Sequence, residues 1–246
     1  MPIQDLIVIF AALFVGGAMK SATGLGLPII GIPVLTAYSN LHFAIAVILI
    51  PSVLSNAWQV WKFRKEHTPR YIAIAIFIGA CAGIILGVTL LAYLPERWLN
   101  LGVALVVTVF LVSRVLRPDW RLSDRMARLL AFPASISAGI LQGATGISAP
   151  AVLMYLSSVG LDRGSFIFSV SLLFLVSGAA QVPAMMVAGL LGPHQIFGSA
   201  LALIPVVAGM WLGEHLGKYI SVKLFNQLIM GFLVVLVIKL AWSVFT

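Results

Sequence analysis

The sequence predicts an all-α polytopic membrane protein that is built from two repeats of hydrophobic segments. Three observations predict this fold: the composition, the spacing of the apolar runs, and a motif that occurs twice. Of the 246 residues, 61% are hydrophobic and 9% are charged, whereas about a quarter of the residues of a soluble domain are charged. The lipid bilayer must therefore be the solvent for most of the chain. We expect an integral protein of the cell membrane (the inner or plasma membrane), with membrane lipids as partners.

Apolar runs divide the chain into about eight segments, four in each repeat. Most have roughly the 20 residues that a spanning helix needs, but the first and the fifth are too long for one simple span. The charged stretch 113–128 is the natural junction, so we expect an N-terminal repeat at 1–122 and a C-terminal repeat at 123–246. The runs cover residues 4–38, 41–62, 70–93, 97–116, 128–158, 165–190, 195–217 and 221–244.

The repeated motif lies in the two long segments. Residues 17–28 read GAMKSATGLGLP, and residues 139–150, which lie 122 positions later, read GILQGATGISAP. Proline removes a backbone donor, and glycine permits left-handed geometry at a high conformational cost, so both interrupt helices. We therefore expect breaks at 23–28 and 145–150, which would make both segments broken or re-entrant.

The similarity between the halves continues outside the motif. Gln59 matches Gln181 at the same offset of 122, and Gly83 matches Gly209 at an offset of 126. The long ungapped match indicates an internal duplication, although small residues are common in membrane helices for packing reasons alone.

The orientation of the two copies depends on the two long segments. Four simple spans per half would make the copies parallel, whereas a hairpin in each half would invert them. In the hairpin arrangement, Arg163, Lys218 and Lys223 join the more basic side of the membrane. The positive-inside rule therefore favours inverted repeats.

The paired breaks indicate where a substrate would bind. Within a bilayer, non-helical backbone survives only where protein or a water-filled cavity surrounds it. A half-helix N-terminus carries partial positive charge and free amides, which favour an anion. Matched interruptions in two halves of a chain are typical of a transporter's substrate site. Ser21, Thr23, Thr145 and Ser148 add hydroxyl groups at the same depth. The alternative is that these small residues only let helices pack closely.

Lys20 is the most informative single residue. It lies about fifteen positions into the first segment, which is about 20 Å deep in a straight helix. A lysine there costs about 2.5–3.5 kcal/mol, so it usually faces a cavity or a partner. Because no Asp or Glu lies at comparable depth in the chain, an external anion is a suitable partner. The alternative is a lysine whose ammonium group reaches an interface. Its match in the second repeat is Gln142.

The second and sixth segments add neutral polar groups. Ser52, Ser55, Asn56 and Gln59 of the second segment recur at helical spacing and form one polar face. The polar residues of the sixth segment are Ser169, Ser171, Ser177 and Gln181. Either these groups line a substrate path, or they only form hydrogen bonds between helices. The predicted substrate-binding residues are Lys20, Ser21, Thr23, Gly24, Gly26, Asn56, Gln59, Gln142, Thr145, Gly146, Ser148 and Gln181.

Other function classes have little support in the sequence. The net charge of +8 could suggest a nucleic-acid partner, but the basic residues lie between apolar spans, as the positive-inside rule produces. The His residues are scattered without the spacing of a metal site, and no serine-nucleophile or phosphate-loop motif occurs. We therefore expect no nucleic acid, no metal, no cofactor and no enzymatic activity.

The chain resembles the TauE/SafE sulfite-exporter family, also called the TSUP membrane permeases. The resemblance rests on the motif in both halves, on the polar second segment followed by the basic stretch 62–70, and on the glycines at 79, 83 and 87 followed by Leu-Pro-Glu. It covers nearly the whole chain and implies a carrier for small sulfur-containing or carboxylated anions, such as sulfite or sulfoacetate. The stretches 24–27 and 146–149 lack the triple glycine that is usual in the family.

Together, the residues and the resemblance indicate a secondary transporter, a permease or exporter of a small anion such as sulfite, an organosulfonate or a small carboxylate. The anion would lie near the bilayer midplane between the two broken segments. The alternatives are a polytopic membrane enzyme that acts on a lipid-linked substrate and an anion channel. No oligomeric state is predicted.

Overall fold

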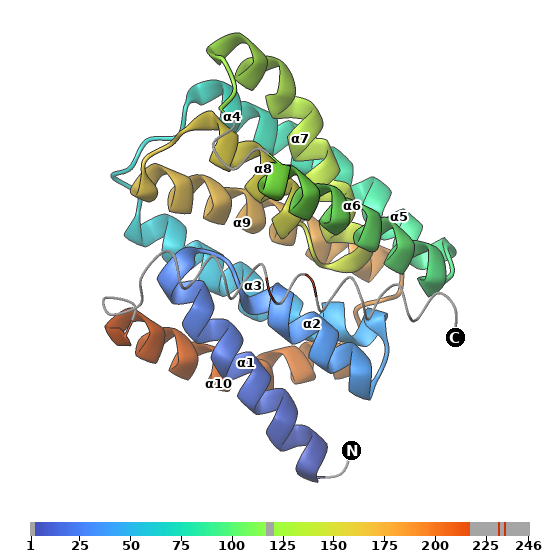
Figure 1. Cartoon of the computed structure of the whole chain (residues 1–246). Helices are drawn as coiled ribbons and strands as arrows, with labels where there is room; N and C mark the ends of the chain where they lie inside the picture. The colour runs from blue at the N-terminus through green and yellow to red at the C-terminus, as the bar shows by residue number, and fades with distance from the viewer. Residues whose placement is uncertain (1–2, 117–120, 217–230, 232–233, 235–246) are drawn as a thin grey trace.

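The computed structural model describes residues 3–116, 121–216, 231 and 234, and every regular element in these residues is helical (Figure 1). Helices α4, η1 and α5 follow one another without interruption and form one long helix with a π-helical turn. The elements in chain order are α1 (Ile3–Thr23), α2 (Leu27–Tyr38), α3 (Leu41–Lys62), α4 (Arg70–Ala75), η1 (Ile76–Ala80), α5 (Cys81–Tyr93), α6 (Glu96–Leu116), α7 (Asp124–Thr145), α8 (Ala149–Val159), α9 (Arg163–Val187) and α10 (Pro193–Leu216).

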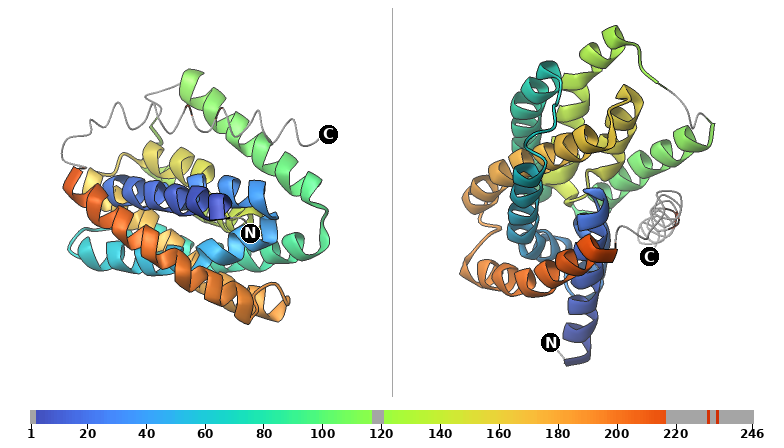
Figure 2. Two further views of the ribbon diagram at one scale, coloured as in Figure 1. Left: turned by 90° about the horizontal axis from the view of Figure 1, so that it is seen from below. Right: turned by 90° about the vertical axis from the view of Figure 1, so that its left-hand side faces the viewer.

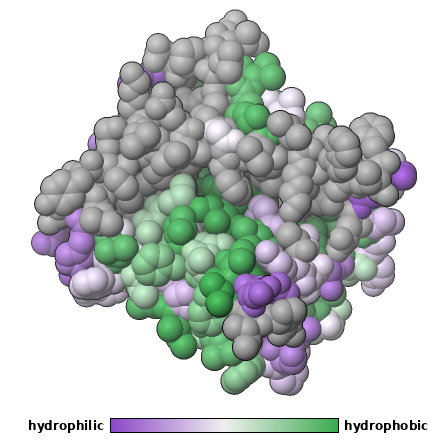
Figure 3. Space-filling view, turned by 60° about the horizontal axis from the view of Figure 1, so that its bottom comes forward, coloured by the Kyte–Doolittle hydropathy of each residue, from purple (hydrophilic) through white to green (hydrophobic). Residues whose placement is uncertain are grey.

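Five helical stretches of the described residues are long and apolar enough to cross a membrane. They belong to α1, α3, the continuous α4–η1–α5 helix, α9 and α10, while α2 and α8 are shorter apolar helices. Hydrophobic residues cover the middle of the face in Figure 3. The chain is thus an all-α polytopic integral membrane protein. The count of eight segments stays a prediction, and the eighth, 221–244, lies outside the described residues apart from 231 and 234.

The first long segment forms a helical hairpin. Gly24 and Gly26, between α1 and α2, have φ angles of +82° and +134°, which glycine adopts without the steric penalty of a Cβ atom. Helix α2 then runs back along α1, because Gly31 of α2 lies against Leu13 in the middle of α1. Figure 1 shows the two helices diverging from this turn.

The fifth segment forms a second hairpin. Gly146 ends α7 with a φ angle of +71°. Near the other end of the hairpin, the Leu122 amide donates to the Ser158 carbonyl at 2.8 Å, and the Tyr155 hydroxyl donates to the Ala127 carbonyl at 2.8 Å. These pairs require α8 to run antiparallel to α7. Both long segments therefore break within the motif and return, as the sequence predicts.

Each hairpin packs against a helix from the opposite half of the chain. Helix α1 crosses α10 (Figure 2), and α7 crosses η1 and α5. Gly209 of α10 faces the Phe14 carbonyl, and Gly83 of α5 faces the Ile136 carbonyl, so closely that a Cβ atom would overlap the oxygen. Glycine is what permits such close helix crossings. Gly83 and Gly209 are 126 residues apart, and Phe14 and Ile136 are 122 residues apart. These are the two repeat offsets in the sequence. This supports the predicted duplication; the repeat boundaries and the inverted orientation stay predictions.

A proline in α3 helps to fix α10 beside it. Pro51 has no N–H, so the Val47 carbonyl loses its helical partner. The hydroxyl of Ser199 in α10 donates to this carbonyl at 2.7 Å and accepts the Ile50 amide at 3.2 Å. The buried Ser199 hydroxyl thus gives the Val47 carbonyl a hydrogen bond that its apolar neighbours could not provide.

Replacing Ser199→Ala should therefore leave the Val47 carbonyl buried without a donor. We expect the free energy of unfolding in detergent to fall by about 1–3 kcal/mol. The control is Ser137→Ala, since this exposed hydroxyl bonds only a carbonyl of its own helix, that of Pro133, and it should change stability little. Equal losses in both variants would contradict this role for Ser199.

Replacing Gly209→Ala should push α1 and α10 apart, because the new methyl group would overlap the Phe14 carbonyl. We expect a loss of about 1–3 kcal/mol in the free energy of unfolding. Gly102→Ala in α6 is the matched control, since a Cβ atom there meets nothing within 4 Å, and alanine has the higher helix propensity. If thermal denaturation finds no difference between the variants, the close crossing is wrong.

Candidate functional site

The two helix breaks meet at one small cavity. It has a volume of about 10 Å³, which is near the lower limit for one water molecule. Helices α2 and α8 both begin at this cavity, so motif residues that are far apart in the sequence lie together, in a closed conformation. The lining residues are Leu25, Gly26, Pro28 and Ile29 from the first hairpin, Ile147, Ser148 and Ala149 from the second, and Phe174 from α9.

The helix N-termini at the cavity lack side-chain caps. Helices α3, α7 and α9 begin with Asn40, Ser123 and Asp162, whose side chains accept backbone amides of the first turn. Among the described residues, no side chain caps α2 or α8, where Gly26 and Ser148 occupy the cap positions. The first-turn amides of a helix have no intrahelical partner, and they carry partial positive charge that attracts anions. Two such N-termini therefore point their positive ends toward the same place.

Lys20 lies beside this cavity, enclosed by protein. Its side chain is 1% exposed, and Nζ donates to Asn56 Oδ1 at 2.7 Å and to the Gly24 carbonyl at 3.2 Å. Nζ also lies 5.7 Å from the centroid of the Phe174 ring, within reach of a cation–π contact. These three partners of Lys20, which all lie in the described part of the chain, are neutral groups. The side-chain amine is enclosed by these contacts and does not reach the protein surface.

At each break, one glutamine donates a hydrogen bond to the last helical turn. Gln59 Nε2 donates to the Lys20 carbonyl at 2.9 Å, and Gln181 Nε2 donates to the Gln142 carbonyl at 3.2 Å. Each of these carbonyls also accepts the amide of the glycine four residues later, at 2.8 Å. The two contacts occupy matching positions in the two halves, and in this conformation both amide groups serve to position the breaks.

The second break has its own polar contacts. The Thr145 hydroxyl donates to the Leu141 carbonyl at 2.7 Å and accepts the Ile147 amide at 3.2 Å. The Ser148 hydroxyl donates to Gln142 Oε1 at 2.9 Å instead of capping α8. These contacts shape the loop around Gly146 while leaving the N-terminus of α8 uncapped.

Most of the predicted site residues come together around the cavity and Lys20. The predicted glycines, Gly24, Gly26 and Gly146, adopt the positive φ angles that make the turns. Ser21 is half-buried in α1, and none of the described hydrogen bonds joins it to the other site residues. The side chain of Thr23 falls outside the part of the structure that is described.

Two residues beside the site are not among the predicted substrate-binding residues. Phe174 lines the cavity and contacts Lys20, and the Ser171 hydroxyl donates to Gln59 Oε1 at 3.1 Å. The repeat offset could have identified Phe174, because it lies 122 positions after Ser52 of the polar face. The sequence places Ser171 among the polar groups of the sixth segment, but its matching position is an apolar leucine, so the repeat does not mark it as a site residue.

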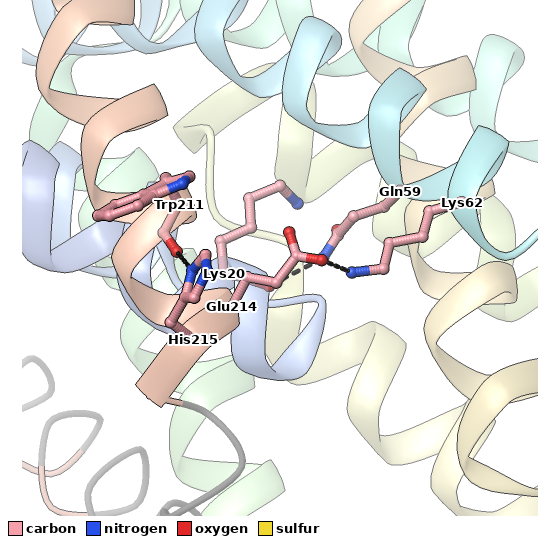
Figure 4. A network of polar contacts seen from close by, with 6 residues as sticks. All are labelled: Lys20, Gln59, Lys62, Trp211, Glu214 and His215. Atoms are coloured by element: carbon pink, nitrogen blue, oxygen red, sulfur yellow. Dashed lines mark hydrogen bonds and ion pairs between the residues drawn. The ribbon is translucent and has the colours of Figure 1, made fainter.

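A surface ion pair lies one helical turn beyond Gln59. Lys62 at the end of α3 pairs with Glu214 near the end of α10 (Figure 4). Both side chains are partly exposed, at 38% and 44%, so the pair contributes at most about 1 kcal/mol to stability. It nevertheless connects α3, which carries Asn56 and Gln59, to α10.

The contact between Lys20 and Asn56 can be measured by a double-mutant cycle. We expect Lys20→Met and Asn56→Leu to show a coupling energy of about 1.5–3 kcal/mol in the free energy of unfolding, the usual range for a hydrogen bond to a charged group. Chemical denaturation of the two single variants, the double variant and the native protein gives the cycle. A coupling energy near zero would mean that the two side chains do not interact.

Comparison with known proteins agrees with this architecture. The family model described as "Sulfite exporter TauE/SafE" matches residues 8–240, nearly the whole chain. No curated protein and no solved structure gave a significant match. Members of this family are membrane transporters that export sulfur-containing anions. The extent of the match shows that this integral membrane protein belongs to the sulfite exporter TauE/SafE family.

Proposed function

We propose that this protein is a secondary transporter of a small sulfur-containing or carboxylated anion, such as sulfite, an organosulfonate or a short carboxylate. The observation that carries the proposal is that two uncapped helix N-termini, from opposite halves of the chain, meet beside the buried Lys20. Both features favour negative charge. The enclosure by protein keeps competing water away from them.

Different groups would supply the charge and the hydrogen bonds that bind the anion. Lys20 supplies the charge, and the backbone amides around Gly26 and Ser148 supply hydrogen bonds to the anion's oxygen atoms. Gln59 and Gln181 act mainly as positioning residues, because each donates to the carbonyl that precedes a break. When the anion enters, it competes with Asn56 Oδ1 for the ammonium group of Lys20. Asn56 thus stabilises the lysine while the site is closed.

The closed cavity implies that transport requires movement. A volume of about 10 Å³ is far too small for an anion with three or more heavy atoms, so the two hairpins must separate before the anion enters. The first hairpin packs with α10 and the second with α5, which suggests two bodies that rock against each other, as in alternating access. We propose inverted repeats at 1–122 and 123–246 and a location in the inner or plasma membrane.

Anion binding to purified protein tests the proposal. We expect one of sulfite, a short sulfonate or a short carboxylate to raise the unfolding temperature of the native protein and to lose this effect in Lys20→Gln. A ligand at 100 times its Kd stabilises a protein by about 2.7 kcal/mol. Lys65→Gln, which removes an exposed charge outside the site, is the control and should respond like the native protein.

Transport in proteoliposomes distinguishes a carrier from a channel. A carrier should show saturable uptake of the same anion and counterflow, both lost in Lys20→Gln and retained in Lys65→Gln. Flux that does not saturate would indicate a channel instead. If no anion stabilises the native protein, or if Lys20→Gln binds as well as the native protein, the anion site proposed here is wrong.

A further inference from the structure

We infer that the anion recognised by this site also carries a hydrogen-bond donor, which Gln181 Oε1 accepts and which the Ser177 hydroxyl contacts. The inference rests on the proposed function and extends it to a substrate class. That class is a small sulfonate, or similar anion, that bears a hydroxyl or ammonium group a few atoms from its charge.

Two buried polar atoms on α9 lack a partner among the described residues: Gln181 Oε1 and Ser177 Oγ. Both residues are 0% exposed. A buried polar group without a hydrogen bond destabilises a protein by about 1–3 kcal/mol, so such groups are rare and call for a specific explanation. A bound molecule that contacts them in the open, loaded state is one explanation, because the site must rearrange to admit a ligand.

Comparison of the two halves shows that the missing partner is specific to the second half. Gln59 and Gln181 make the same contact through Nε2, but among the described residues only Gln59 Oε1 has a donor, which is the Ser171 hydroxyl. The position that matches Ser171 in α3 is occupied by Leu49, which has no donor to offer Gln181. The first half thus completes the hydrogen bonds of its glutamine from within the protein, whereas the second half leaves an acceptor open.

The serine on the same helix face shows the same difference. In the first half, the Ser55 hydroxyl donates to the Ser52 carbonyl at 3.0 Å. Its match, Ser177, has no hydrogen-bond partner among the described residues. The two open groups are four residues apart on α9, so they lie on one face of the helix. An open pair on one face is more consistent with a shared ligand than with two unrelated defects.

The chemistry of the open atoms determines what the ligand must offer. An amide oxygen such as Gln181 Oε1 can only accept hydrogen bonds, while a serine hydroxyl can donate or accept. The sulfonate or carboxylate end of a ligand has no proton at neutral pH and cannot satisfy Gln181. The ligand must therefore contribute an O–H or N–H group at this end of the site, in addition to the anionic group that Lys20 attracts.

The spacing along α9 relates the two open atoms to Phe174. Phe174, which lies 5.7 Å from Lys20 Nζ, precedes Ser177 by three residues and Gln181 by seven. At 1.5 Å per residue these intervals are about 4.5 Å and about 10 Å along the helix axis. Ser177 and Gln181 therefore lie about one and two turns of α9 beyond Phe174. The probes below are accordingly short and place the donor group two carbon atoms from the sulfonate.

Two probes of matched size test the inference: 2-hydroxyethanesulfonate, which has a hydroxyl donor, and propane-1-sulfonate, which has a methyl group in its place. We expect calorimetry or thermal shift on the full-length protein to show about three- to tenfold tighter binding of the hydroxyl probe, as one net hydrogen bond provides. In Ser177→Ala and in Gln181→Met this preference should fall toward one.

Ser55→Ala is the matched control, because it removes the equivalent hydroxyl from the first half, where a partner already exists. It should keep the preference of the native protein. Since Ser177→Ala removes a hydroxyl that bonds nothing in the described structure, it should fold even if Gln181→Met does not.

The outcomes separate this inference from the proposed function. If both probes bind with equal affinity and both lose affinity in Lys20→Gln, the anion site stands and the donor requirement is wrong. If neither probe, nor sulfite, nor a short carboxylate stabilises the native protein, the proposed function itself fails. A preference for the hydroxyl probe that Ser177→Ala and Gln181→Met both retain would also overturn the role assigned to these atoms.

Discussion

The two helix interruptions control the rest of this structure, because each exposes backbone groups that a bilayer cannot hydrogen-bond. The protein solves this problem in the same way twice: a glutamine from α3 or α9 donates to the carbonyl that precedes each break. The breaks are thereby kept inside the protein, against α3 and α9. Burying them together brings two positive helix N-termini to one place, so the requirement for satisfied backbone and the capacity to attract an anion have the same origin.

The second organising feature is the difference between otherwise matching halves. Lys20 corresponds to Gln142, and Asn56, which holds the lysine, corresponds to Gly178. The charge therefore comes from one half alone, while both halves supply a helix N-terminus. Two buried lysines in one low-dielectric site would repel each other. One cation and one neutral amide avoid this repulsion and make the proposed site asymmetric.

Much of the site could be predicted from the sequence because glycine, proline and lysine have strong physical consequences inside a membrane. The breaks at Gly24–Gly26 and Gly146–Ser148 followed from residue type, and the importance of Lys20 followed from the energy of burying a charge. The sequence predicted Asn56 as a site residue, but it did not predict the hydrogen bond between Asn56 and Lys20. Phe174 was missed, since an aromatic residue in an apolar segment is ordinary by itself, and Ser171 was recognised only as one of several polar groups in the sixth segment.

The sequence by itself determined the membrane environment, the helical segments and the positions of the two hairpin turns, because these depend on composition and on local backbone chemistry. Only the tertiary structure decided that each hairpin packs on a helix of the opposite half, and that the two turns face one cavity. It also decided which polar atoms have a hydrogen-bond partner among the described residues, such as Gln59 Oε1, and which do not, such as Gln181 Oε1. These properties depend on contacts between residues far apart in the chain, which no local pattern specifies.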